Sequence, residues 1–408
     1  MTNGIIKRVF VVGAALVMAA ASLYTPTASA HGEKSQQAFL RMRTIHWYNL
    51  KWSTDKLNVN EEMNITGNFH VWKDWPQAVR EPEQSFLNVG SPGPVVVRQE
   101  SYVNGHLVPR SLRLIPGGDY EFKIVLKGRR PGTWHIHTMI NVSAGGPMIG
   151  PGKWVTIEGS MADFTNPVKT LTGQTIDIET WGIGNVYGWS LFWYLFGVAW
   201  VVYWARNPLF IPRHLKVQAG QDIITDADRK ASWGFLVAAI VFTTYSYSAG
   251  RSAHPITIPL QAGTLRGIEP LTIERKVEVV VKHASYRVPG RAVSATLEVT
   301  NKGDSPVELT EFETGGIRFL NAAVFKDDTG YPADMLAESG LTVEGGSVGP
   351  GETKTLQIQA EDAAWEVQRM ADVVYDPDSR FGALLHFFDA QGKHHIAPIG
   401  GPLIPQFM

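Results

Sequence analysis

The 408-residue chain contains no cysteine. Disulfides, iron–sulfur clusters, thiolate zinc sites and covalently attached haem of the CxxCH type are therefore excluded. A blue-copper centre is excluded as well, because it requires a cysteine thiolate ligand. Any metal that this chain binds must be held by nitrogen and oxygen atoms.

Charge is also scarce: 18% of the residues are charged, and the formal net charge is −1. With no basic run in the sequence, nothing predicts a nucleic-acid partner. The composition is 44% hydrophobic, and the 40 glycines and 24 prolines indicate many turns, as in all-β domains. This length is typical of two to three domains.

Residues 1–30 have the organisation of a secretory signal peptide. A basic start at Lys7 precedes a short apolar run over 9–23, and a small-residue cleavage site ends at Ala30. Cleavage there leaves His31 as the first residue of an exported chain. An uncleaved membrane anchor is the alternative interpretation.

Two stretches of twenty residues, 186–205 and 231–250, carry no formal charge. At about 1.5 Å per residue, each helix would span about 30 Å, the thickness of a bilayer core. The loop between them is richer in basic residues than the outer flanks, so the positive-inside rule places it in the cytoplasm. Both large flanking segments then lie outside, in agreement with the signal peptide. A buried core helix is the alternative for each stretch.

The flanking segments, 31–180 and 262–408, show the period-two pattern of β-strands. Tyr120, Phe122 and Ile124 alternate with polar residues, and similar short runs are separated by Pro-Gly pairs. This spacing predicts a β-sandwich or barrel in each segment. The expected fold class is therefore mainly β, with two β domains joined by two transmembrane α-helices.

The strongest local signal for a metal is Trp134-His135-Ile136-His137. Alternate residues of a strand point to the same face, so His135 and His137 project together while Ile136 faces the core. Two imidazoles at that spacing can share one metal ion. Two surface or hydrogen-bonded histidines are the alternative.

His31 strengthens the metal hypothesis. An N-terminal histidine offers its α-amine and its imidazole Nδ1 to one ion, once the amine has lost its proton. With His135 and His137 the set has four nitrogens, which in a tetragonal arrangement favours Cu(II). Zinc is the alternative metal.

Other histidines give weaker signals. His46 and His70 are a second candidate pair, each close to a tryptophan, and two partly buried, hydrogen-bonded histidines are the alternative. The histidines of the C-terminal segment form no H-x-H pattern, and we interpret that domain as structural. They are His283, His386, His394 and His395.

Several long motifs resemble the B subunit of particulate methane monooxygenase and, more broadly, of the copper membrane monooxygenases that include ammonia monooxygenase. They are HGEKSQQAFLRMRTIHWYNLKWS from His31, FLNVGSPGPVVVRQESYVNG from Phe86, LKGRRPGTWHIHTMINV from Leu126, GGPMIGPGKWVTIEGSM from Gly145 and the C-terminal PLIPQFM. The resemblance covers essentially the whole chain. It implies two cupredoxin-like outer domains and a complex with the A and C subunits, assembled as a trimer of such protomers in the plasma or an intracytoplasmic membrane.

The resemblance also implies site residues and a reaction. By position in the matching motifs, His31, His135 and His137 correspond to the copper ligands of the family, and His46 and His70 to a second copper site found in some members. The family hydroxylates a small substrate with O₂ and quinol-derived electrons, converting methane to methanol or ammonia to hydroxylamine. The motif around His46 and His70 favours methane.

Three alternatives remain open at this stage. The chain could be the ammonia-oxidising homologue, a non-catalytic scaffold stabilised by copper, or a periplasmic copper-handling protein. The last is disfavoured because its usual Met-rich or Cys ligands are not clustered here. Which chain of the complex holds the catalytic copper is not encoded in this sequence.

Overall fold

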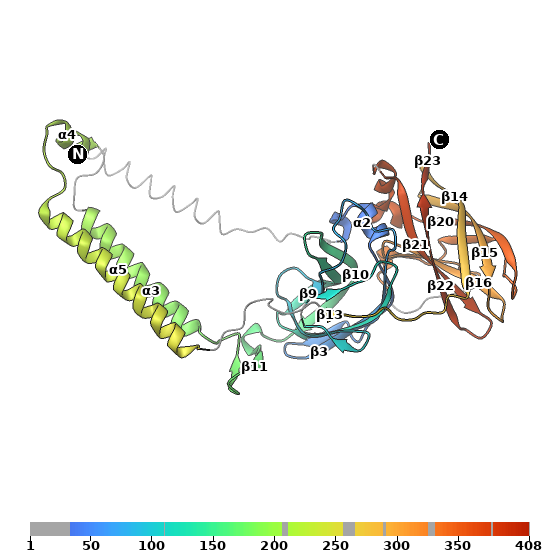
Figure 1. Cartoon of the computed structure of the whole chain (residues 1–408), viewed down its shortest axis with the longest axis horizontal. Coiled ribbons are helices and arrows are strands. Elements are labelled where there is room, and N and C mark those ends of the chain that lie inside the picture. The colour runs from blue at the N-terminus through green and yellow to red at the C-terminus, as the bar shows by residue number, and fades with distance from the viewer. Residues whose placement is uncertain are drawn as a thin grey trace. The chain divides into compact units, whose positions relative to one another are not determined.

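The computed structural model describes residues 33–109, 111–205, 211–255, 266–288, 291–324, 331–376 and 378–407. The expected signal peptide and His31 lie outside the described residues. The chain divides into two compact units, one formed by residues 1–161 and 265–408 and the other by residues 162–264. The first unit contains the β domains, and the prediction of a mainly β chain is confirmed (Figure 1).

Two sheets of the first unit enclose the N-terminal hydrophobic core. The first has the order β1-β3-β8-β5-β6, with β1 (Ile45–Trp52), β3 (Glu62–Val71), β8 (Asp119–Gly128), β5 (Val96–Val103) and β6 (His106–Leu107). The second has the order β13-β7-β4-β9-β10-β2, with β13 (Arg266–Gly267), β7 (Leu112–Arg113), β4 (Ser85–Gly90), β9 (Gly132–Val142), β10 (Gly146–Glu158) and β2 (Lys56–Asn58).

The alternation read from the sequence sets the faces of these strands. On β8, Tyr120, Phe122 and Ile124 are buried, while Glu121 and Lys123 between them are exposed. Side chains of successive residues leave a strand on opposite faces, so one face of β8 packs into the core. The period-two pattern therefore identified a core strand correctly.

Two further sheets enclose the C-terminal core. One has the order β19-β20-β15-β14-β23, with β19 (Leu341–Glu344), β20 (Thr353–Glu361), β15 (Ala292–Asn301), β14 (Val277–Val288) and β23 (Ile404–Phe407). The other has the order β18-β17-β16-β21-β22, with β18 (Leu336–Ala337), β17 (Ile317–Leu320), β16 (Val307–Thr314), β21 (Arg380–Asp389) and β22 (His394–Pro402). Short helices accompany them: α6 (Ala364–Val367), η3 (Ala333–Met335) and η4 (Met370–Tyr375).

The two cores exchange segments that are distant in sequence. Helix α2 (Ala38–Arg43), which follows η1 (Glu33–Ser35), buries Ala38 and Met42 in the C-terminal core. In the other direction, β13 adds to an N-terminal sheet and Ile268 packs into the N-terminal core. The two β domains are therefore built from interleaved parts of the chain.

The second unit contains the long helices. This unit begins within η2 (Met161–Asp163). Its other elements, in chain order, are β11 (Pro167–Lys169), β12 (Thr175–Asp177), α3 (Ile183–Ala205), α4 (Ile211–Gln218) and α5 (Asp226–Ala253). Helices α3 and α5 run side by side (Figure 1), and the rings of Phe192 and Phe242 lie 4.7 Å apart between them. A capping box formed by Thr225 and Asp228 begins α5.

Only α3, among the helices of the described residues, is both long and apolar enough to cross a membrane. It contains the predicted stretch 186–205. The second stretch, 231–250, lies inside α5, whose ends carry charged residues. The α-helical prediction is thus confirmed for both stretches, and the membrane crossing of α3 and of α5 stays a prediction.

Candidate metal centre

The H-x-H motif lies on β9, in the middle of its sheet. His135 and His137 are buried on one face, and Ile136 between them points into the N-terminal core. Trp154, opposite His135 on β10, places its ring 4.9 Å from the imidazole. The strand therefore orients both histidines to one side, as their spacing predicts.

The two imidazoles present nitrogen atoms to each other. His135 Nδ1 and His137 Nε2 are 2.8 Å apart, and the ring planes are nearly perpendicular at 89°. His137 Nδ1 donates a hydrogen bond to the carbonyl of Gly150 at 3.1 Å, which fixes its proton there and leaves Nε2 as a lone-pair nitrogen. Two adjacent ligands at right angles, each about 2.0 Å from one ion, would be about 2.8 Å apart. The donor set therefore fits a nitrogen-bound transition metal.

Glycines on β10 make room for His137. The pairing of β10 with β9 is irregular between Ile149 and Gly152, and a Cβ atom at Gly152 would lie 2.5 Å from His137 Nδ1. A Cβ atom at Gly150 would lie 2.4 Å from Trp47 Nε1. Only glycine permits so close an approach of the backbone. The glycines of the GGPMIGPGKW motif thus shape the site, a role that the sequence analysis did not assign.

Gln36 attaches the N-terminal segment to β10. Its Oε1 accepts a hydrogen bond of 2.8 Å from the Ile149 N–H, and its Nε2 donates to the Pro147 carbonyl. Ile149 pairs with Met139, two residues beyond His137 on β9. Gln36 directly follows η1 (Glu33–Ser35), so these hydrogen bonds fix the end of that helical turn beside β10, the neighbour of the strand that carries the histidine pair.

His46 and His70 face each other in register across β1 and β3, and both are buried. His46 uses both ring nitrogens: Nδ1 lies 2.8 Å from Glu313 Oε2, and Nε2 donates to the Met42 carbonyl at 2.6 Å. His70 Nδ1 lies 3.0 Å from Asp119 Oδ1. The structure brings the predicted pair together, with carboxylates engaged at both histidines.

Charged groups around His70 form a network. Asp119 also binds Arg275, and the Tyr48 hydroxyl lies 3.4 Å from the same carboxylate. Burial lowers the pKa of His70, although Asp119 opposes the shift. Burial and the Asp119 carboxylate together raise the pKa of Tyr48. These groups hold β1, β3 and β8 to the residues that lead into the C-terminal domain.

Sequence reasoning missed a third histidine pair. His386 on β21 and His394 on β22 are brought together by strand pairing, with Glu311 on the neighbouring β16. No H-x-H pattern marks them, because the contact is made between strands. Within the described part of the chain, no three His, Asp or Glu side chains gather in a way that could hold a metal ion.

Comparison with known proteins decides the family. The family model for the monooxygenase B-subunit protein matches residues 32–407. This chain belongs to the family of monooxygenase B subunits. The chain is also 56% identical, over 401 residues and 97% of each sequence, to the particulate methane monooxygenase alpha subunit of Methylococcus capsulatus (strain ATCC 33009 / NCIMB 11132 / Bath). As a member of this family, it is one subunit of a monooxygenase complex, so other subunits are implied.

Two solved structures are more distant from this monooxygenase B subunit. The cupredoxin domain of amoB from Nitrosocaldus yellowstonii is 18% identical, with 30% of this chain and 91% of that chain covered and a TM-score of 0.24. The fibronectin(III)-like modules of CbhA from Clostridium thermocellum are 7% identical, with 89% and 95% covered and a TM-score of 0.15. TM-scores this low are no evidence about the fold.

Proposed function

We propose that this monooxygenase B subunit holds copper through His31, His135 and His137, in a membrane complex that hydroxylates methane to methanol with O₂ and quinol-derived electrons. The observation that carries the proposal is the pair of imidazole nitrogens at 2.8 Å, His135 Nδ1 and His137 Nε2. The name of the 56% identical relative favours methane over ammonia.

Processing of the N-terminus completes the proposed ligand set. Removal of residues 1–30 gives His31 a free amine, and this amine and the His31 imidazole then add two nitrogens to the pair on β9. Bound copper would supply the one-electron redox chemistry needed to activate O₂. The four-nitrogen set without a thiolate suits Cu(II).

The chain's own residues hold the imidazoles ready. The Gly150 carbonyl keeps the proton of His137 on Nδ1, so the nitrogen facing His135 carries a lone pair. Trp154 packs against His135, and both histidines are less than 10% exposed, so bulk water has little access to them. This preorganisation lowers the cost of ordering the ligands when the ion binds.

The proposal extends to a second copper site and to partners. At His46 and His70, an ion would have to replace one of the two hydrogen bonds of His46, to Glu313 or to Met42.

The proposed partners are the A and C subunits, assembled with this chain as a trimer of heterotrimers, and membrane lipid. Quinol is the proposed electron source. The loop between α3 and α5 is assigned to the cytoplasm and both β domains to the periplasmic or lumenal side.

His137→Ala in the assembled complex tests the proposal. Washed membranes are assayed for turnover of methane and of ammonia. The number of copper ions per complex is measured, and electron paramagnetic resonance records the nitrogen-rich Cu(II) signal. We expect loss of that signal and of methane turnover, with both retained in the exposed control His283→Ala. Loss of copper with turnover retained would support the scaffold function instead, and a preference of the wild type for ammonia would overturn the proposed substrate.

A further inference from the structure

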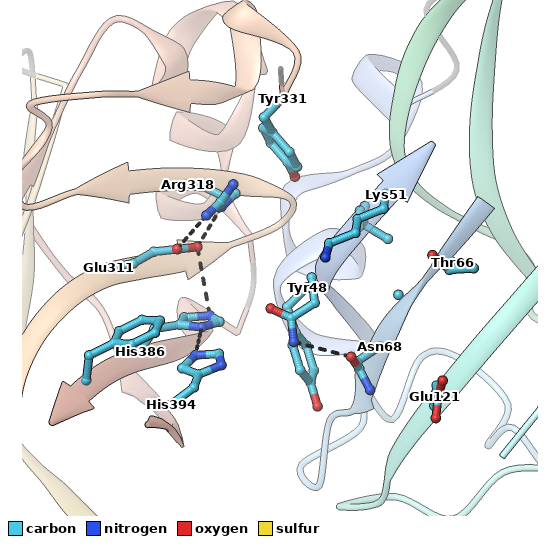
Figure 2. A pocket seen from close by; sticks show the side chains of 14 residues that line it. Tyr48, Lys51, Thr66, Asn68, Glu121, Glu311, Arg318, Tyr331, His386 and His394 are labelled. Carbon is cyan, nitrogen blue, oxygen red and sulfur yellow. Dashed lines mark hydrogen bonds and ion pairs between the residues drawn. The ribbon is translucent and has the colours of Figure 1, made fainter. Parts of the chain in front are cut away.

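A cavity of about 390 Å³ lies between the two β domains of the first unit. Figure 2 shows its two walls: Glu311, Arg318, His386 and His394 come from the C-terminal domain, and residues of β1 and β3 lie opposite them. None of these four residues belongs to the metal sites proposed above.

Strand irregularities shape both walls of the cavity. The pairing of β1 with β3 shifts between Tyr48 and Lys51, where Asn49 has a φ of 53°. The pairing of β16 with β21 shifts between Leu309 and Glu311. Bulges of this kind re-aim side chains and are common beside functional sites. On the C-terminal wall, the shift precedes the carboxylate that faces the histidines.

His386 and His394 repeat the nitrogen separation found on β9, although their rings are oriented differently. His386 Nδ1 lies 2.8 Å from His394 Nε2, the same separation as in the His135–His137 pair. The two rings are nearly parallel, with centroids 4.9 Å apart and an angle of 16° between them. Phe388 also stacks on His394, with ring centroids 4.6 Å apart.

The remaining nitrogen of His386 has no hydrogen-bond partner. His386 is 3% exposed, and its Nε2 lies 3.9 Å from Glu311 Oε1, which is too far for a hydrogen bond. Both oxygens of Glu311 accept hydrogen bonds of 2.8 Å from Arg318. In one tautomer, His386 Nδ1 donates to His394, and the lone pair of His386 Nε2 faces the Glu311 carboxylate. In the other tautomer, His386 Nδ1 accepts from His394, and the N–H at His386 Nε2 has no acceptor within hydrogen-bond distance. The pair is therefore incompletely satisfied in either tautomer.

Burial opposes the charged form of each of these three groups. Burial lowers the pKa of His394 to about 3, with help from His386, and burial also lowers the pKa of His386. Burial alone would raise the pKa of Glu311, but His386 and Arg318 outweigh it and the pKa lies below its usual value. The Glu311 carboxylate, which is buried, thus faces the histidine pair on the cavity wall.

We propose that His386 Nδ1 and His394 Nε2 bind a divalent transition-metal ion, with Cu²⁺ the strongest binder. The ion takes the two facing lone pairs, which places the remaining proton of His386 on Nε2, toward Glu311. Glu311 is then a positioning residue that acts through its charge, since its carboxylate favours a proton on the His386 Nε2 that faces it at 3.9 Å. Water in the cavity completes the coordination. With two protein ligands instead of four, this site binds more weakly than the site proposed at His31.

The test uses the full chain in its complex, in a His137→Ala background that disables the β9 site. Cu²⁺ is titrated against a competing chelator, and bound metal is counted after His394→Gln and after the control His395→Gln. His395 neighbours His394 in sequence but contacts Asp389 at 3.6 Å instead of His386. We expect His394→Gln to remove one ion per chain or weaken its binding at least tenfold, and His395→Gln to change neither.

A second measurement locates the ion and guards against misfolding. Copper with ascorbate and peroxide oxidises the histidines that bind it, so mass spectrometry of the His137→Ala complex should find oxidation at His386 or His394. Glu311→Gln should weaken binding without abolishing it, with an unchanged circular dichroism spectrum. Equal metal counts for His394→Gln and His395→Gln, or oxidation confined to other histidines, would overturn the proposal.

Discussion

His46 and Glu313 form a fully buried pair that joins the two β domains: Nδ1 on β1 lies 2.8 Å from Oε2 on β16, and neither side chain has exposed surface. Each partner is satisfied on its other side. His46 Nε2 donates to the Met42 carbonyl, and Glu313 Oε1 accepts from the Gly316 N–H at 2.7 Å. Such a pair is more costly to break than to keep, since the partner left behind is buried and unpaired.

Glu313→Ala is therefore expected to lower the free energy of unfolding by about 3–5 kcal/mol, the usual cost of removing one partner from a buried pair. Unfolding in urea, followed by tryptophan fluorescence, measures the change. Glu308→Ala is the matched control, because Glu308 lies on the same strand but is exposed. A loss below about 1 kcal/mol for Glu313→Ala, the range of an exposed ion pair, would show that the pair does not hold the domains together.

The difference between His137 and His46 shows what the sequence could predict. The common face of His135 and His137 follows from local strand geometry, and the helices α3 and α5 follow from uncharged stretches of membrane length. The partner of His46 lies 267 residues away in sequence and meets it only through domain packing. His386 and His394 are only eight residues apart in sequence, but they approach each other through the pairing of β21 with β22, which no spacing rule indicated.

Gly152→Ala is expected to displace the His137 ring. The added Cβ would lie 2.5 Å from Nδ1, in the space that the irregular strand pairing leaves for the imidazole. Overpacking of this kind costs about 1–3 kcal/mol, and we expect copper affinity to fall with stability. Gly90→Ala is the control, because its Cβ would make an ordinary contact of 3.5 Å with the Cβ of the same histidine. Chelator competition and urea unfolding on both variants check the prediction, which fails if they behave alike.

Gln36→Ala should weaken copper binding about tenfold while leaving all proposed ligands in place, as loss of supporting groups commonly does. The variant removes both hydrogen bonds that attach the N-terminal segment to β10 at Pro147 and Ile149. The entropy lost in ordering that segment then opposes binding of the ion. Gln37→Ala is the control, since Gln37 is exposed and makes no side-chain cap to α2.

Copper affinity measured by chelator competition distinguishes the two glutamine variants, and the Cu(II) resonance spectrum adds a readout that stability alone would not change. We expect Gln36→Ala to broaden the distribution of copper environments and Gln37→Ala to leave the spectrum unchanged. Equal affinities would show that Gln36 does not position the N-terminal ligand.

Burial of the Tyr286 hydroxyl is expected to make the C-terminal domain sensitive to alkali. Burial, with a smaller effect of Glu366, raises its pKa to about 12, against about 10 in an unfolded chain. Below pH 10 the tyrosine is protonated in both states, and its contribution to stability is fully present. Between pH 10 and 12 only the unfolded chain loses the proton, so this contribution is lost as the pH rises.

Tyr286→Phe should therefore flatten the fall in stability between pH 10 and 12, because phenylalanine has no proton to lose. The edge-to-face contact with Trp365, at 5.7 Å between ring centroids, can form with either residue, so stability at pH 8 should change by less than about 1 kcal/mol. Urea unfolding midpoints at pH 8, 10 and 11.5 measure the slope. Tyr375→Phe is the control, since Tyr375 is 71% exposed. If the Tyr286→Phe slope equals that of the wild type, burial of this hydroxyl does not drive the alkaline transition.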